Sequence, residues 1–125
     1  MKKAYPFYPG TYPIDSYGNG GFRFAKTSHR GSIICCPSGI YTWNIQDFFL
    51  LKLNDLEIIR EKLVSSSLLI LGTGKTHISL SSETRIELFE AGINFDTMST
   101  GAACRTYNIL LAEGRPIMAG LLAVD

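Results

Sequence analysis

The sequence contains no long hydrophobic run. Its apolar stretches are short, and two of them, 48–51 and 68–71, have four residues each. A helix needs roughly 20 apolar residues to cross a bilayer. Lys2 and Lys3 are followed by prolines and tyrosines, not by the apolar core of a signal peptide. We therefore expect a soluble protein of the cytoplasm that does not span a membrane.

The sequence is also poor in charge. Charged residues make up 18 % of it, against about 25 % in a typical globular protein. Twelve basic residues nearly balance 11 acidic ones, for a net charge of +1. The first 30 residues hold five basic residues and one acidic residue, a local +4, which leaves −3 for the rest. We expect no nucleic-acid partner, because a strand edge protected by Lys and Arg explains this local excess as well.

Cysteine and histidine are scarce. Three cysteines and two histidines occur without a C-x-x-C spacing, so we expect no metal site and no cofactor. The odd cysteine count and the missing secretion signal predict reduced thiols. Cys35 and Cys36 are neighbours on a predicted strand, so we expect one to be buried and the other exposed. Cys104 lies in a predicted helix with no histidine placed near it, and no G-x-S-x-G occurs, so no catalytic residue is expected.

The first half of the chain has the pattern of short strands. Residues 1–19 are rich in proline and tyrosine, which predicts an irregular N-terminal arm. Residues 20–125 are predicted to form a single domain, whose 46 % hydrophobic composition, taken over the chain, is enough for a core. The domain begins with a β-meander or hairpin, with strands expected at 22–24, 32–36 and 40–43 and a turn at 27–31.

The second half alternates helices and strands. We expect a first helix with Asn54 as its N-cap and Ser65–Ser67 at its end, a second helix from 82 to 92 and a third from 100 to 113. Strands are expected at 68–71, 93–98 and 116–124. This alternation predicts an α/β fold with a partly parallel central sheet and helices packed on it.

Two loops are candidate binding sites. Gly72, Thr73 and Gly74 follow a buried strand, but the phosphate loop of nucleotide hydrolases needs a glycine where Leu69 stands. We therefore expect a small anion-accepting nest of backbone N–H groups instead of nucleotide hydrolysis. Thr100 begins the third predicted helix, where exposed N–H groups also attract anions. An ordinary N-cap with small residues for tight packing explains the same sequence.

Three polar residues complete the candidate set. Arg105 and Asn108 are three residues apart and share a helix face, and Arg115 follows the end of that helix. Guanidinium groups bind carboxylate or phosphate. The same residues also suit a structural polar network that fastens the helix to the sheet, with Glu113 neutralising one of the arginines.

Several segments together resemble a known family. They are Gly20–Phe24, Gly31–Ile34, Gly39–Trp43, Leu71–Gly74 and, as the most specific part, Thr100–Arg115. They resemble the small domain shared by the mitochondrial respiratory complex I assembly factor 3 and the adipogenesis-associated Mth-domain proteins, over residues 14–124, and the chain looks like a bacterial member. The resemblance implies a compact fold with a mixed central sheet and a β-hairpin extension. It also implies protein partners and no known catalytic residues.

These observations lead to two functional hypotheses. The first is a binding or assembly-type protein without catalytic activity, which recognises other proteins at Gly72–Gly74 and the helix start. The alternative is a small-anion-binding protein or an enzyme that uses Thr73, Thr100, Arg105 and Arg115. We also expect a homodimer, because the charge is low and the chain holds seven Phe and six Tyr residues.

Overall fold

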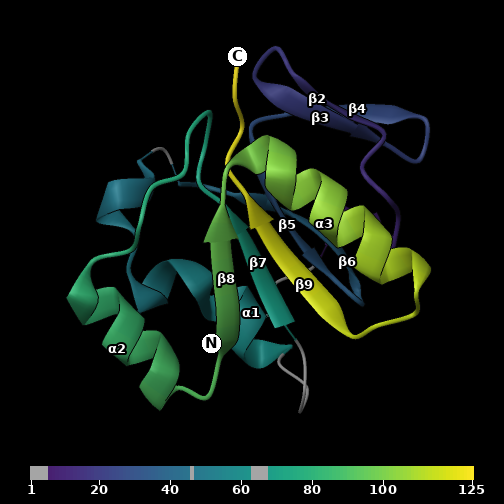
Figure 1. Ribbon diagram of the computed structural model, residues 1–125. Coiled ribbons are helices and arrows are strands. Elements are labelled where there is room, and N and C mark those ends of the chain that lie inside the picture. The colour runs from purple at the N-terminus through teal and green to yellow at the C-terminus, as the bar shows by residue number, and fades with distance from the viewer. Residues whose placement is uncertain (1–5, 46, 63–67) are drawn as a thin grey trace.

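Two β-sheets and three α-helices make up the computed structural model, which describes residues 6–45, 47–62 and 68–125 (Figure 1). The strands are β1 (Tyr8–Pro9), β2 (Ser16–Gly18), β3 (Gly21–Phe24), β4 (Thr27–Arg30), β5 (Ser32–Cys36), β6 (Gly39–Trp43), β7 (Leu68–Gly72), β8 (Asn94–Met98) and β9 (Ile117–Leu121). The helices are α1 (Glu57–Glu61), α2 (Ser82–Glu90) and α3 (Thr100–Ala112), with two 3-10 helices, η1 (Phe48–Leu50) and η2 (Leu53–Leu56). The predicted mixed α/β single domain is confirmed.

The larger sheet has the strand order β1-β6-β5-β9-β7-β8. In it β7 pairs parallel with β8 and β9, whereas β5 pairs antiparallel with β6 and β9, so the sheet is mixed. β2, β3 and β4 form a separate antiparallel sheet, here called the small sheet. Because β7, β8 and β9 run parallel, their carboxyl ends meet at one edge, where the two predicted loops begin.

Apolar side chains cover both faces of the larger sheet. Leu69 and Leu71 belong to a core shared with η1, η2, α1 and α2. Ile70, between them, belongs to a second core under α3 and the small sheet, which lie together on one side of the larger sheet (Figure 1). Each fully buried aliphatic side chain stabilises the fold by about 1.5–3 kcal/mol.

This double cover corrects the expectation for the paired cysteines. Cys35 packs in the core under α3 and Cys36 in the core on the other face. Both are buried, with exposed fractions of 0 % and 1 %. The prediction that one of them is exposed was wrong, because β5 is an inner strand with apolar layers on both sides.

The first forty residues also differ from the prediction. The turn expected at 27–31 is strand β4, and the chain reverses instead at Ala25 and Lys26, whose φ angles are +49° and +63°. Phe24 pairs with Thr27 across this two-residue turn. Such turns usually carry Gly or Asn. Because neither residue type occurs at positions 25 and 26, the sequence pattern did not indicate this turn. The arm expected to be irregular contains two strands, β1 paired with β6 and β2 paired with β3.

The second and third predicted helices are confirmed as α2 and α3. Ser81 accepts a hydrogen bond from Thr84 N at 3.2 Å, and Ser99 accepts one from Ala102 N at 3.3 Å. Each serine therefore supplies a partner to a backbone N–H that the helix itself leaves free.

The first predicted helix differs from the structure. It is a short α1 preceded by η2, and Asn54 lies inside η2 and not at an N-cap. The Asp55 carboxylate instead accepts from Lys52 N at 2.9 Å. The expected helix end at Ser65–Ser67 lies outside the described residues. Within the residues described, every helix is too short or too polar to cross a membrane.

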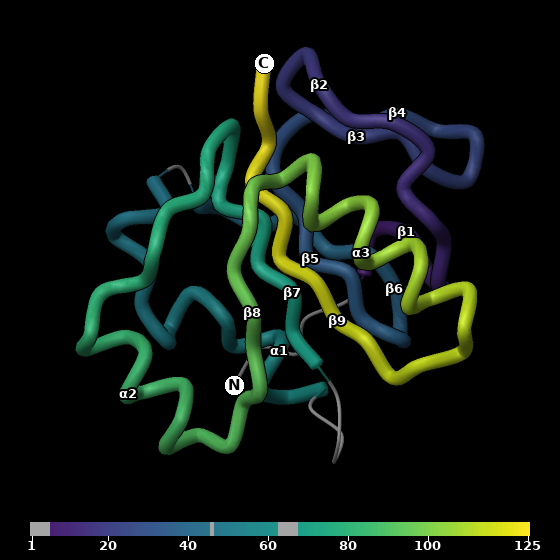
Figure 2. The backbone as a smooth tube through the Cα atoms, in the orientation of Figure 1, coloured from purple at the N-terminus to yellow at the C-terminus, as the bar shows by residue number. Residues whose placement is uncertain are grey.

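The C-terminal segment joins the two sheets. Leu122 N donates to Gly72 O at 3.1 Å, directly after β9. Val124 O then accepts from Gly20 N, at the turn between β2 and β3, at 2.8 Å. Figure 2 shows this segment rising past the start of α3 toward the small sheet. The predicted loops, the C-terminal segment and the small sheet are thus neighbours at one end of the molecule.

Candidate functional site

The loop at Gly72–Gly74 and the start of α3 lie together, as the sheet topology requires. Gly74 N donates to Thr100 Oγ1 at 3.0 Å, and Thr100 N donates to Gly74 O at 2.8 Å. The Thr100 hydroxyl, fully buried, donates in turn to Leu122 O at 2.7 Å. A Cβ at Gly72 would lie 3.0 Å from the Thr100 Cα, so glycine permits this close approach of helix and strand.

Thr73 organises the rest of this loop. Its hydroxyl donates to Thr76 O at 2.7 Å and accepts from Ile78 N at 2.9 Å, and its own N–H donates to Met98 O at 2.8 Å. Both threonine hydroxyls are therefore occupied inside the chain, and the N–H groups of Thr73 and Gly74 are too. The arrangement supports the packing explanation of these residues, and anion binding by them stays a prediction.

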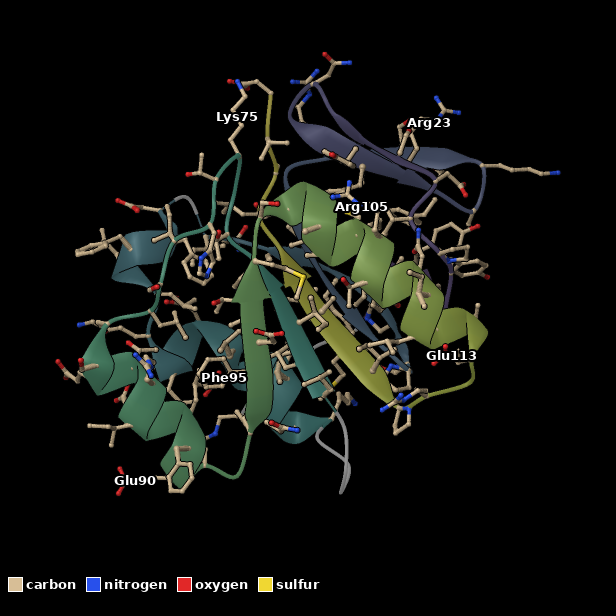
Figure 3. The ribbon with its side chains drawn as sticks, in the orientation of Figure 1. Arg23, Lys75, Glu90, Phe95, Arg105 and Glu113 are labelled. Atoms are coloured by element: carbon tan, nitrogen blue, oxygen red, sulfur yellow. The ribbon has the colours of Figure 1, made fainter. Side chains whose placement is uncertain are left out.

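The three polar residues of the candidate set are not brought to one point. Asn108 clamps the backbone of Ile14, with its Oδ1 accepting from Ile14 N and its Nδ2 donating to Ile14 O, both at 2.8 Å. Arg115 pairs with Glu113 at 3.8 Å in solvent, at the far end of α3 (Figure 3). Arg105 is exposed, and it lies one turn into α3. Asn108 therefore fastens α3 to the segment before β2, whereas a network of the two arginines with the sheet stays a prediction.

Nucleophilic and metal chemistry find no support in the described part of the chain. Cys35, Cys36 and Cys104 are buried free thiols. Burial raises the pKa of Cys36 to about 12 and that of Cys104 to about 12, and it raises the pKa of Cys35 as well. The reactive thiolate is therefore disfavoured at neutral pH. No three His, Cys, Asp or Glu side chains gather as metal ligands among these residues.

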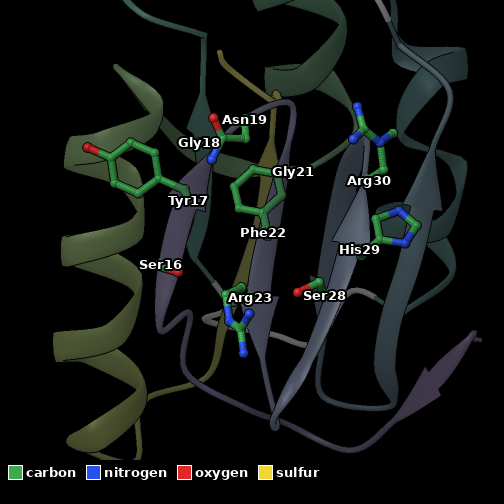
Figure 4. A pocket seen from close by; sticks show the side chains of 10 residues that line it. All are labelled: Ser16, Tyr17, Gly18, Asn19, Gly21, Phe22, Arg23, Ser28, His29 and Arg30. Carbon is green, nitrogen blue, oxygen red and sulfur yellow. The ribbon is translucent and has the colours of Figure 1, made fainter.

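The outer face of the small sheet forms a polar hollow of about 400 Å³ (Figure 4). Arg23 and Arg30, both exposed, lie at opposite ends of it. His29 also borders this region, but its ring stacks on Phe7 with the centroids 4.4 Å apart, and burial lowers its pKa. The basic excess of this segment is visible in the sequence, but its place on a sheet face is not.

A second surface, which the sequence analysis missed, is apolar and surrounds α2. Seven large hydrophobic side chains are exposed among the described residues, and four of them lie on η1 and α2. These four are Phe49 (66 % exposed), Leu50 (66 %), Ile86 (58 %) and Phe89 (82 %). We call them the α2 surface. A signal was available: Ile86 and Phe89 are three residues apart, on a helix face different from that of the buried Thr84 and Leu88.

Two hollows flank α2 within this surface. One, of about 320 Å³, lies between α2 and η1 and is bordered by Lys52, Glu83 and Glu87. The other, of about 450 Å³, lies between Ile86, Phe89 and Phe95 of β8. Figure 3 shows Phe95 on β8 beside α2. Thr84 fastens the helix to the preceding segment by donating to Leu51 O at 2.8 Å, so the apolar side chains stand on a fixed support.

The chain is similar to proteins of known sequence along most of its length. An uncharacterized protein of Rhodobacter capsulatus is 36 % identical over 122 residues, which cover 98 % of this chain and 93 % of that protein. The human NADH dehydrogenase [ubiquinone] 1 alpha subcomplex assembly factor 3 is 27 % identical over 112 residues. These cover 87 % of this chain but 59 % of the assembly factor, so the chain spans about three fifths of that relative.

Solved structures share the fold. A crystal structure of a Bartonella henselae protein described as an outer membrane protein has a TM-score of 0.87 and 50 % identity, covering 94 % of this chain and 99 % of that one. The solution structure of a Mth938-like domain from Bordetella pertussis has a TM-score of 0.73 and 26 % identity, covering 98 % and 92 %. Residues 14–122 match the model of a single family. The chain belongs to that family, which is described as a protein of unknown function (DUF498/DUF598).

Proposed function

We propose that this protein is a binding or assembly-type protein without catalytic activity, which holds another protein on the α2 surface. The observation that carries the proposal is that four of the seven large hydrophobic side chains exposed among the described residues lie on η1 and α2, beside two separate hollows. Contiguous exposed apolar patches rimmed by polar groups are typical of protein interaction sites. The similarity to a mitochondrial assembly factor supports the same class of function.

The chemistry of the surface defines the partner. Its apolar side chains border two hollows, and the polar rim is formed by Glu83, Glu87 and Lys52 at one hollow and by Arg85 at the other. We therefore expect a partner that inserts apolar side chains into the two hollows and presents basic residues to the two glutamates. This surface replaces the Gly72–Gly74 loop as the preferred recognition site, because the polar groups of that loop bond to one another.

Affinity purification with surface variants tests the proposal. The wild-type chain, Phe89→Ser and Ile109→Ser are each used as bait in a native lysate. Ile109 is the matched control, since it is 60 % exposed but lies on α3. We expect the same partner on the wild type and on Ile109→Ser, with its loss on Phe89→Ser. Equal recovery by all three baits, or no partner in repeated experiments, would contradict the proposal.

We also propose that the protein works in the cytoplasm, supported by its three free thiols. Because one relative is described as an outer membrane protein, cell fractionation followed by immunoblotting is the direct test. Recovery with the outer membrane would contradict a cytoplasmic location.

A further inference from the structure

The outer face of the small sheet has an ordered arrangement of donors. Ser16, Arg23 and Ser28 are register partners on the three adjacent strands, so their side chains form one row across the sheet. Gly18, Gly21 and Arg30 form the next row on the same face. Figure 4 shows both rows around the hollow. Two serines and two arginines therefore border the hollow, whose floor is open at Gly18, and the two guanidinium groups point to opposite ends of it (Figure 4).

The charge of this hollow is not compensated. None of the ten residues that line it is acidic. The one ion pair among the described residues joins Arg115 to Glu113 on another element, so neither Arg23 nor Arg30 has a carboxylate partner in that part of the chain. The hydroxyls of Ser16 and Ser28 likewise have no hydrogen-bond partner among those residues. The donors are thus available, in contrast to those of Thr73 and Thr100.

The spacing of the two arginines indicates the size of the ligand. They occupy diagonal positions on β3 and β4, since Arg23 is opposite Ser28 and Arg30 is opposite Gly21. Diagonal neighbours in an antiparallel pair are about 7–8 Å apart, within reach of two long side chains that bend toward one molecule. A Cβ at Gly20 would lie 3.7 Å from Arg30 Nη1, so this guanidinium already lies against the rim at the β2–β3 turn.

We propose that this hollow binds a small molecule through a pyrophosphate group. Guanidinium forks pair with phosphate oxygens in bidentate geometry. Two forks and two hydroxyls supply more donors than a single carboxylate can accept, whereas a pyrophosphate offers oxygens to both ends of the hollow. A volume of about 400 Å³ is within the range of small-molecule sites. The site is separate from the α2 surface, so it does not depend on the proposed protein partner.

Isothermal titration with inorganic pyrophosphate tests this site in the 125-residue chain. We expect saturable binding that weakens as salt concentration rises. The double variant Arg23→Gln/Arg30→Gln should weaken it by at least about tenfold, because two charge-assisted contacts are lost. Both side chains are exposed, so the variant should keep its fold, which circular dichroism verifies. Inorganic phosphate should bind more weakly than pyrophosphate, since it reaches only one arginine.

Two control variants separate this site from other basic positions. Arg85→Gln removes an exposed arginine from α2, and Lys75→Gln removes the cation beside the Gly72–Gly74 loop (Figure 3). Both should bind pyrophosphate like the wild type. Loss of binding in Lys75→Gln with retention in the double variant would overturn the proposal and assign the anion to the loop. Absence of saturable binding in the wild type would also overturn it.

Discussion

A single hydroxyl group joins three separate segments at the carboxyl edge of the larger sheet. Thr100 Oγ1 accepts from Gly74 N and donates to Leu122 O, so it connects α3 to the loop after β7 and to the segment after β9. Thr100 and Gly74 are buried and Leu122 is half-buried, so the bond from Gly74 N in particular is shielded from water. The residue that the sequence indicated as an anion ligand therefore has a structural role that can be measured.

We predict that Thr100→Val lowers the free energy of unfolding by about 2–3 kcal/mol. Valine has nearly the shape of threonine, but it leaves the Gly74 N–H and the Leu122 carbonyl without their partner, and each unsatisfied buried group costs about 1–3 kcal/mol. Urea unfolding followed by circular dichroism measures the change.

Thr106→Val is the control for this prediction. Thr106 lies on the same helix, is half-buried and has no side-chain hydrogen bond among the described residues. Its replacement should change the stability by less than about 0.5 kcal/mol. Equal stability of Thr100→Val and the wild type would show that the hydroxyl does not support this junction.

At the scale of elements, the small sheet contacts the start of α3 through the side chain of Tyr17. A Cβ built on Gly101 would collide with the hydroxyl of Tyr17 on β2. Asn108 holds Ile14, just before β2, by two hydrogen bonds. Tyr17 of the small sheet therefore packs where Gly101 carries no side chain. Two helical turns further along α3, the Asn108 amide holds the segment before β2.

We predict that Gly101→Ala is less favourable for stability in the wild type than when Tyr17→Ala is also present. In a helix, alanine is favoured over glycine by roughly 0.5–1 kcal/mol, but here the added methyl group displaces Tyr17. Removing the tyrosine ring removes the collision and leaves only the helix preference. A double-mutant cycle by urea unfolding gives the coupling. Additive effects of the two substitutions would contradict the contact.

The sequence predicted those elements whose local signals agree with their tertiary surroundings. The apolar run at Leu68–Leu71 indicated an inner strand, and the helices predicted at 82–92 and 100–113 coincide with α2 and α3. The turn at Ala25 and Lys26 could not be found, because neither residue type favours a positive φ and only the pairing of β3 with β4 imposes it. The prediction of Asn54 as an N-cap was wrong, because Asn54 lies inside η2 and the Asp55 carboxylate accepts the hydrogen bond from Lys52 N.

The candidate site was predictable in its location but not in its chemistry. The rule that parallel strands end at one edge placed Gly72–Gly74 beside Thr100. It could not show that their donors already bond to acceptors within the chain, because that depends on the close approach of α3 that Gly72 permits. The α2 surface was missed because Ile86 and Phe89 were not assigned to a face, and only the placement of Leu88 in the core shows that they point to solvent.

At the scale of the whole molecule, the excess basic charge and the α2 surface lie on different elements. The first 30 residues carry +4 and the rest −3, and the described basic residues of this segment include the two arginines of the small sheet. The α2 surface is apolar with a polar rim that carries both signs of charge. Self-association through the apolar surface would not bring the basic excess of two copies together.

We predict that, in the absence of the partner protein, two copies form a homodimer through the α2 surface in a two-fold arrangement. It carries four of the seven large hydrophobic side chains that are exposed among the described residues, and an isologous contact buries the same surface on both copies. Multi-angle light scattering should give twice the monomer mass at high protein concentration.

Phe89→Ser should return the mass to that of a monomer, because its side chain is 82 % exposed and carries apolar area to the contact. Ile109→Ser removes an exposed aliphatic side chain from α3 instead. This variant should leave the dimer intact. A wild-type chain that stays monomeric at every concentration excludes the dimer and leaves the α2 surface for a different protein.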